Sequence, residues 1–255
     1  MHIIHSSAFL ISLDTDTPTS PIAHSRSLWH GSLSPSTSDA PGLKNRWVDK
    51  PVQFIVFDNA RAGFVAEHSV MDATVTTRMC NEVLEWLADP AFDLGYSSTS
   101  AIPLLPPKPL DFIVDETTRS AIDRASKAAY ELAYSQAMSY HLTPYGKAAI
   151  KSFGVSPDAW AQMIIQLAYA RLLRVHGLKR EGGTYEVATT RKYWKGRTET
   201  IRVVTSQSDA FVRAMDDPRV SREGRKNLFN AAVKTHITLA KAAGNGEGVD
   251  RHMLG

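Results

Sequence analysis

Cysteine is almost absent from this chain, in which Cys80 is the single example. An intrachain disulfide is therefore excluded, and a reducing compartment or an organelle matrix is the expected environment. Cys80 lies on the apolar side of a predicted helix, which favours a core position over a role as nucleophile. Stability must then come from packing, for which a hydrophobic content of 43% is sufficient.

Long hydrophobic runs and strong charge are also lacking. No eighteen consecutive apolar residues occur, so the sequence predicts no transmembrane helix. The apolar N-terminal stretch has no basic region before it and no cleavage site after it, and no targeting signal is visible. A net charge of +3 is too small to indicate a nucleic-acid partner.

The hydrophobic patterning predicts a mixture of strands and helices. Strands are expected at residues 3–13, 52–57, 63–67, 186–189 and 200–204. Helices are expected at residues 74–87, 115–141, 206–215 and 221–243, and a further one begins at Ser156. Five prolines between Asp89 and Pro109 indicate a boundary, so we expect domains at residues 1–108 and 109–255.

His68 is the histidine best placed for chemistry, because it lies at a predicted strand-to-helix junction. Asp72 follows four residues later, and in a helical turn its carboxylate can orient the imidazole. An imidazole with an ordinary pKa near ~6.5 can accept a proton from a hydroxyl group at neutral pH. The alternative from spacing alone is a histidine with a purely structural role in a turn.

Lys147 and Lys151 form a second candidate site. Four residues apart on a helix, their ammonium groups would lie on one face and could hold phosphates, although a solvated basic face is the simpler alternative. The run Ser156-Pro157-Asp158 predicts a helix start, since Ser caps, Pro suits the first position and Asp complements the helix dipole.

Several motifs of this chain resemble, in the same order, the choline/carnitine acyltransferase family, and within it the fungal carnitine acetyltransferases. They are Asn45–Asn59, Ala62–Phe64, Glu67–Asp72, Tyr145–Lys147, Lys151, Ser156–Ala159, Thr184–Glu186 and Gly196–Arg202. The resemblance implies an α/β fold of the CoA-dependent acyltransferase type, with mixed sheets and flanking helices. It also implies reversible transfer of a short acyl group between CoA and L-carnitine.

The resemblance assigns roles to individual residues. His68 would be the general base and Asp72 its support, while Arg197 is a candidate ion-pair partner for Asp72. Lys147 and Lys151 would meet the 3′-phosphate of CoA, and Asp158 would lie near its pantetheine or adenosine part. The carnitine contacts would come from Tyr185 and Thr198, whose hydroxyl groups suit a carboxylate. Coenzyme A and acetyl-CoA are substrates in this family, so neither a metal nor a permanently bound cofactor is expected, and the implied location is mitochondrial or peroxisomal.

Departures from the family pattern lead to a second hypothesis. Ala60, Ala66 and Ala73 replace common glycines and would be strained wherever a positive φ is needed, and Val187 replaces a pocket serine. Ser97–Ser100 resembles the family's Ser-Thr-Ser motif but lies in the proline-rich stretch, so we interpret it as part of a linker. Because family members are about twice as long or longer, the alternative function is a truncated, non-catalytic fragment or pseudoenzyme that binds CoA weakly or pairs with another chain.

Overall fold

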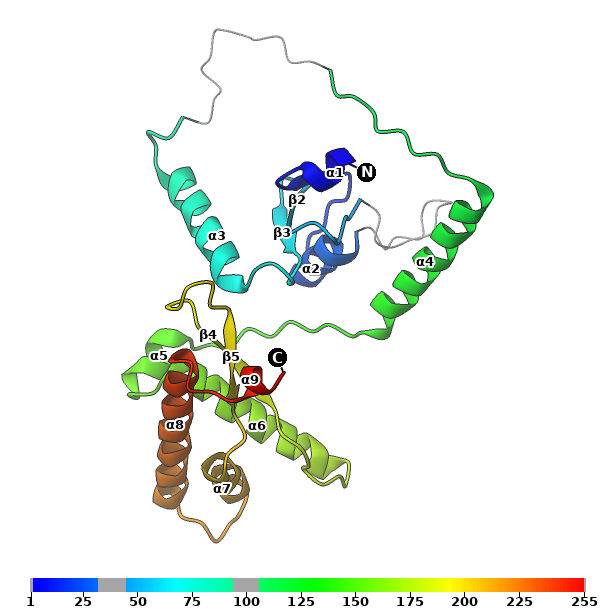
Figure 1. The fold of residues 1–255 in the computed structure, drawn as a ribbon. Coiled ribbons are helices and arrows are strands. Elements are labelled where there is room, and N and C mark those ends of the chain that lie inside the picture. Colours follow the sequence, from blue (N-terminus) through cyan, green and yellow to red (C-terminus); the bar gives the residue numbers. More distant parts are fainter. Residues whose placement is uncertain (1, 32–44, 94–105, 255) are drawn as a thin grey trace. The chain divides into compact units, whose positions relative to one another are not determined.

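The computed structural model of the chain describes residues 2–31, 45–93 and 106–254. Its contacts divide it into two compact units, Met1–His141 and Leu142–Gly255, and each unit is described by itself (Figure 1). The predicted division between residues 108 and 109 differs from this one, and its assignment of functional segments to domains stays a prediction. Ser97–Ser100, interpreted as part of a linker, lies outside the described residues.

A three-stranded mixed sheet forms the centre of the first unit. Its strands β1 (Leu10–Asp14), β2 (Val52–Phe57) and β3 (Ala62–Ala66) lie in the order β1-β2-β3. β1 runs parallel to β2 with Ile11 opposite Phe54, and β2 runs antiparallel to β3. Alternate side chains of β2 are buried, as expected for a strand whose one face meets the core. The mixed sheet agrees with the expected fold class, although only small sheets are present among the described residues.

The β2–β3 hairpin turns through a residue with unfavourable backbone geometry. The amide of Ala60 donates to Phe57 O at 2.9 Å, and the amide of Phe57 donates to Arg61 O at 2.9 Å. These bonds define a three-residue loop whose last position is left-handed, and Ala60 has a φ of 60° there. The structure therefore confirms strain at one of the three alanines that replace family glycines.

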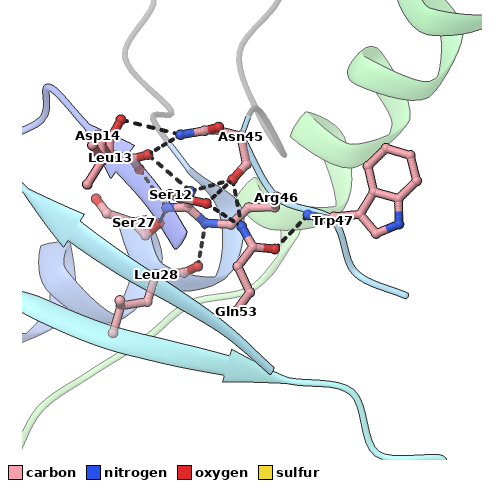
Figure 2. A network of polar contacts seen from close by, with 9 residues as sticks. All are labelled: Ser12, Leu13, Asp14, Ser27, Leu28, Asn45, Arg46, Trp47 and Gln53. Carbon is pink, nitrogen blue, oxygen red and sulfur yellow. Dashed lines mark hydrogen bonds and ion pairs between the residues drawn. The ribbon is translucent and has the colours of Figure 1, made fainter. Parts of the chain in front are cut away.

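A buried polar network ties the segment after the gap at residues 32–44 to the sheet (Figure 2). The Arg46 guanidinium pairs with the Asp14 carboxylate at 2.7 Å, and these side chains are 1% and 7% exposed. Arg46 also donates to Leu28 O at 2.8 Å and to Ser27 O at 2.5 Å. One side chain thereby joins the end of β1 to the last turn of a neighbouring helix, α2.

The helices of the first unit are α1 (His2–Ser6), α2 (Pro21–His30), α3 (Ala73–Ala88) and α4 (Glu116–Ser135). The predicted strand at residues 3–13 was wrong over its first half, because α1 occupies it. Lys50, only 5% exposed, donates to Ile4 O at 2.5 Å and His5 O at 3.2 Å, so a distant ammonium group satisfies the carbonyls at the end of α1.

Two helices differ from their predicted extent or burial. α4 was expected to reach residue 141 but ends at Ser135, whose hydroxyl donates to Leu132 O at 2.7 Å. α3 matches its predicted range, yet Thr76 is its only buried residue and Leu84 and Leu87 on its apolar side are exposed within the described structure. Cys80, expected in the core, is half-buried.

The second unit consists of helices and one two-stranded sheet among its described residues. Its elements are α5 (Lys147–Ser152), α6 (Pro157–Val175), β4 (Tyr185–Thr189), β5 (Thr198–Arg202), α7 (Ser206–Met215), α8 (Arg222–Gly244) and α9 (Asp250–Leu254). Its main core is formed by apolar side chains of α5, α6, α7, α8 and the α5–α6 loop: Ile150, Val155, Ala159, Met163, Phe211, Val212, Ala232 and Val233. Ser156 caps α6 through its hydroxyl, as predicted, by accepting from the Ala159 amide at 3.4 Å.

An antiparallel ribbon of β4 and β5 covers part of α8 (Figure 1). Its inward face packs Ala188 and Ile201 against Ala243. The strand predicted at residues 200–204 instead spans 198–202. It ends there because the Val203 carbonyl accepts a hydrogen bond from the Gln166 side-chain amide at 2.8 Å and Thr205 caps the next helix. On α6, the large apolar side chains of Ile164 and Leu172 are exposed. None of the described helices has the length and apolarity needed to cross a membrane.

Candidate functional site

His68 lies in the loop between β3 and α3, beside Asp72. Asp72 is the N-cap residue of α3, with extended backbone angles, and its side chain makes no capping hydrogen bond to the helix. Its Oδ1 lies 3.5 Å from His68 Nδ1, which is a long contact that favours an imidazole with Nδ1 toward the carboxylate. The His68 side chain is 81% exposed within its unit. Nδ1 is therefore the ring nitrogen that faces the Asp72 carboxylate.

The loop around His68 is held by its own polar contacts. The Glu67 carboxylate accepts a hydrogen bond from the Ser69 amide at 2.8 Å and another from the Ser69 hydroxyl. These bonds restrict the backbone on both sides of His68.

Lys147 and Lys151 lie one turn apart on α5, as predicted. Both residues are exposed, while Ile150 of the same helix is buried in the core. The helix is therefore anchored by its apolar side, and the two ammonium groups are presented to solvent on the other. A pair of cations at this spacing can bind a phosphate group.

Asp158 takes part in a cluster that the local sequence did not indicate. Its Oδ2 lies 2.9 Å from Nε2 of His236 on α8, and Oε2 of Glu186 on β4 lies 3.6 Å from the same nitrogen. The His236 side chain is 2% exposed, the Glu186 side chain 26% and the Asp158 side chain 51%. Three elements thus bring two carboxyl groups and one imidazole to the edge of the core.

The pKa of Glu186 is raised above its ordinary value. Burial is the largest cause, followed by a hydrogen bond and charge repulsion from the Asp158 carboxyl, while His236 and Gln162 act in the opposite direction. Two carboxylates this close repel each other when both are ionised, which disfavours the charged form of Glu186.

The same three side chains are also the candidate metal ligands among the described residues. Their ligand atoms lie within 4.8 Å of one another. The 2.9 Å contact between His236 and Asp158 is, however, a hydrogen-bond distance. Atoms that bind one zinc ion at about 2.0–2.1 Å in a tetrahedron would stand roughly 3.3 Å apart. The geometry therefore fits a hydrogen bond between His236 and Asp158 better than a metal.

Tyr185 and Thr198 lie on the same face of the β4–β5 ribbon but at opposite ends. Thr198 pairs with Thr189, and Tyr185 lies four residues further along, or roughly 14 Å at strand spacing. This face is turned away from the core, and Val187 lies on it between the two. The Arg251 guanidinium lies 6.0 Å from the centre of the Tyr185 ring. One ligand could reach both hydroxyl groups only if it extended along the ribbon.

Sequence reasoning missed Glu186 and His236 as members of a polar cluster. The position of His236 did carry a signal, because it interrupts an otherwise small and apolar stripe of α8 that includes Ala232, Val233 and Ala243. A polar residue on such a stripe needs a buried partner. Nothing in the sequence indicated that the partner would be Asp158, which is 78 residues away.

Known proteins resemble this chain along its full length. The chain is 38% identical over 263 residues to the mitochondrial carnitine O-acetyltransferase of Saccharomyces cerevisiae, with 100% of the chain and 37% of the yeast protein covered. It is 32% identical to the carnitine O-acetyltransferase of Rattus norvegicus, covering 99% of the chain and 39% of that protein. The muscle carnitine O-palmitoyltransferase 1 of Rattus norvegicus is 33% identical over 98% of the chain and 32% of its own length.

The chain thus spans less than two fifths of each of these relatives. The profile of one family, described as Choline/Carnitine o-acyltransferase, matches residues 1–255, which is the whole chain. A match over every residue, with the motifs around His68, Lys147 and Thr198 in the family's order, shows that the chain belongs to the choline/carnitine acyltransferase family.

Proposed function

We propose that the chain is the part of a carnitine O-acetyltransferase that carries the general base and segments that bind CoA and carnitine. The enzyme would reversibly transfer a short acyl group between CoA and L-carnitine, and the proposed acyl group is acetyl. The observation that carries the proposal is the solvent-accessible imidazole of His68 with Asp72 beside its Nδ1. The names of the yeast and rat relatives support the substrates.

In this mechanism His68 Nε2 accepts the proton of the carnitine hydroxyl while the oxygen attacks the thioester carbonyl carbon. The tetrahedral intermediate then breaks its carbon–sulfur bond, and the departing CoA sulfur takes the proton from the imidazolium. Both substrates meet at one histidine, so the mechanism requires neither a metal nor a covalent enzyme intermediate. The Asp72 carboxylate would stabilise the imidazolium and hold its orientation.

The remaining site residues would bind the two substrates. Lys147 and Lys151 would hold the 3′-phosphate of CoA, and Asp158 would lie near the pantetheine or adenosine part of the same substrate. Tyr185 and Thr198 would contact a carnitine molecule that extends along the outward face of the ribbon. CoA and acetyl-CoA enter as substrates, with no permanently bound cofactor, and the proposed location is mitochondrial or peroxisomal.

A second function is a non-catalytic member of the family that pairs with another chain. It is favoured by large apolar side chains that are exposed in the described residues, such as Ile113 at 99%, Trp194 at 91% and Leu142 at 82%. A partner chain that covered these side chains would remove their apolar area from water.

The deciding experiment measures acetyl transfer from acetyl-CoA to L-carnitine through release of the CoA thiol. We expect His68→Ala to lower the rate by roughly 10²- to 10⁴-fold, the usual contribution of a general base. The matched control is His176→Ala, an exposed histidine at the end of α6, which should stay within about twofold of wild type.

The outcomes separate the two functions. A His68→Ala protein with the wild-type rate would exclude His68 as the base. A wild-type chain that melts cooperatively but transfers no acetyl group would support the non-catalytic function instead.

A further inference from the structure

A groove with apolar walls lies between α6, α7 and α8, which pack against one another in the second unit (Figure 1). Its volume is about 810 Å³, within the range of roughly 300–1,000 Å³ that sites for small organic ligands have. Met163 and Phe211 in its lining are buried, whereas Phe153 and Ile164 are exposed. An apolar group that entered the groove would therefore leave water and contact the hydrophobic core.

The groove lies on a different face of α6 from Asp158. Trp160, Ile164 and Leu167 line it, and an α-helix turns by roughly 100° per residue. These three side chains therefore project about 180–240° around the helix axis from Asp158. A ligand in this groove is thus distinct from a substrate that lies beside Asp158.

Positive charge is concentrated where α8 begins. Arg222 and Lys226 line the groove one turn apart on this helix, and both are exposed. Arg225 lies between them and donates to Ala214 O at 3.1 Å and to Asp217 O at 2.8 Å, which fixes the start of α8 to the end of α7. Glu223 is the acidic member of the described lining, so basic groups outnumber acidic groups there.

Apolar walls beside a pair of cations select an anionic amphiphile. The alkyl part of such a ligand gains from burial against aromatic and aliphatic side chains, and its charged end is attracted to the two cations. The lining from Trp160 to Leu167 extends about 10 Å along α6. That length suits one alkyl chain of medium length.

We propose that this groove binds a medium-chain fatty acid. Its alkyl chain lies along Trp160, Ile164 and Leu167, and its carboxylate lies between Arg222 and Lys226. The inference goes beyond the proposed function, because none of these side chains belongs to the proposed base or to the proposed CoA and carnitine contacts. Acetyl transfer and fatty-acid binding can therefore fail independently.

The test is isothermal titration calorimetry of the full chain with decanoate, below the concentration at which it forms micelles. Decanol has the same chain without the charge, and acetate has the carboxylate without the chain. We expect decanoate to bind severalfold more tightly than decanol, and acetate to give no measurable binding. High salt should weaken decanoate and leave decanol unchanged, because salt screens the exposed cations.

Variants of the two cations test the charged end of the site. Arg222→Gln combined with Lys226→Gln should weaken decanoate binding by about three- to tenfold, the range expected for two exposed charge contacts. Decanol binding should change by less than about twofold. Lys234→Gln combined with Lys241→Gln removes two exposed lysines later on α8 and is the matched control, which should leave both ligands unaffected.

Two neighbouring isoleucines of α6 test the apolar part of the site. Ile164 lines the groove, whereas Ile165 lies on another face, and both are exposed. We expect Ile164→Asp to weaken decanoate and decanol by about tenfold or more, because it places a carboxylate against the alkyl chain. Ile165→Asp should change either affinity by less than about twofold. Circular-dichroism melts of both variants show whether they remain folded.

Three results would overturn the proposal. Decanoate that does not bind, or binds no more tightly than decanol, would exclude a site built for a carboxylate. Equal losses in Ile164→Asp and Ile165→Asp would show that decanoate binds non-specifically. A ligand-free chain that sediments as a dimer, and becomes monomeric in Ile164→Asp, would show that a second copy of the chain covers the groove instead.

Discussion

Ala60 adopts a left-handed backbone conformation that is unfavourable for a residue with a side chain. Its φ of 60° places the methyl group near the following carbonyl oxygen, at a cost of about 1–2 kcal/mol relative to a right-handed conformation. We expect Ala60→Gly to raise the free energy of unfolding by about 1 kcal/mol, because glycine adopts this φ without the clash. Urea denaturation provides the measurement.

A matched control comes from the same hairpin. Ala66 lies in β3 and has no positive φ, so Ala66→Gly should lower stability by about 0.5–1 kcal/mol through backbone entropy. If both glycine substitutions destabilised the protein equally, strain at Ala60 would be excluded.

The raised pKa of Glu186 leads to a second prediction about a single residue, which concerns the pH dependence of stability. Its pKa in the folded state is raised by burial and by the Asp158 carboxyl. A raised carboxyl pKa favours the protonated folded state, so the Glu186 contribution to stability is full below the ordinary glutamate pKa and is lost as the pH rises through the raised value.

Glu186→Gln removes this ionisation while keeping the shape. We expect its melting temperature to exceed that of wild type at pH 7–8, and the difference to shrink toward pH 4. Glu223→Gln, in the exposed first turn of α8, is the control and should not reproduce this trend. A pH-independent difference for Glu186→Gln would contradict a raised pKa.

At the scale of elements, Arg46 joins β1 to the end of α2 through bonds to Asp14, Ser27 and Leu28 (Figure 2). Removing one member of a buried ion pair leaves the other charge uncompensated, which costs about 3–5 kcal/mol. Arg46→Met should therefore lower the free energy of unfolding by about that amount. The exposed Arg119, paired with Glu116 at 3.0 Å, is the matched control, and Arg119→Met should cost less than about 1 kcal/mol.

Chemical denaturation of the two methionine variants would check this difference. In the double variant Arg46→Met with Asp14→Leu, stability should partly recover, because no unpaired charge remains. A double variant that lost the sum of both single effects would mean that the two side chains act independently.

The predicted bounds of the helices and strands were confirmed where neighbouring residues in the sequence determine them. β2 has the predicted bounds, and α6 begins at its Ser156 cap because one hydroxyl satisfies the orphan amide of Ala159. The predictions failed where a distant residue intervenes. Lys50 stabilises a helix in residues expected to form a strand, and the Gln166 amide takes the carbonyl of Val203 just after β5 ends.

At the scale of the molecule, the buried apolar side chains are unevenly divided. In the described residues Ile55, Phe57 and Ala133 belong to the first unit, and the others belong to the second. Burial of each large side chain contributes about 1.5–3 kcal/mol, so the second unit has a core of its own. We expect residues 142–255, expressed alone, to melt cooperatively by circular dichroism.

The first unit provides the comparison for this prediction. The described residues of the first unit include few buried apolar side chains, and among them the three-stranded sheet ends at β1 and β3 without a further strand. This piece alone should melt at a lower temperature or without a cooperative transition. A non-cooperative melt of residues 142–255 would show that its core depends on the rest of the chain.

The sequence by itself determined the local features of the site and the family. The four-residue spacing puts Lys147 and Lys151 on one helix face, because a helical turn dictates that arrangement. Asp72 lies beside His68 as the spacing predicted, although both residues lie in the loop before α3 and not in a helical turn. The order of the motifs along the chain indicated the choline/carnitine acyltransferase family, and the comparisons confirm that membership. The roles of Tyr185 and Thr198 stay predictions.

Only the tertiary structure decided that Asp158, Glu186 and His236 meet. They lie on α6, β4 and α8, and no local pattern encodes the contact of a carboxylate with an imidazole 78 residues away. Their meeting depends on how the ribbon and two helices pack around one core, which buries His236 and leaves Asp158 half exposed. Burial in this packing raises the pKa of Glu186. The sequence alone does not determine that pKa, because it does not show which groups bury the carboxyl group.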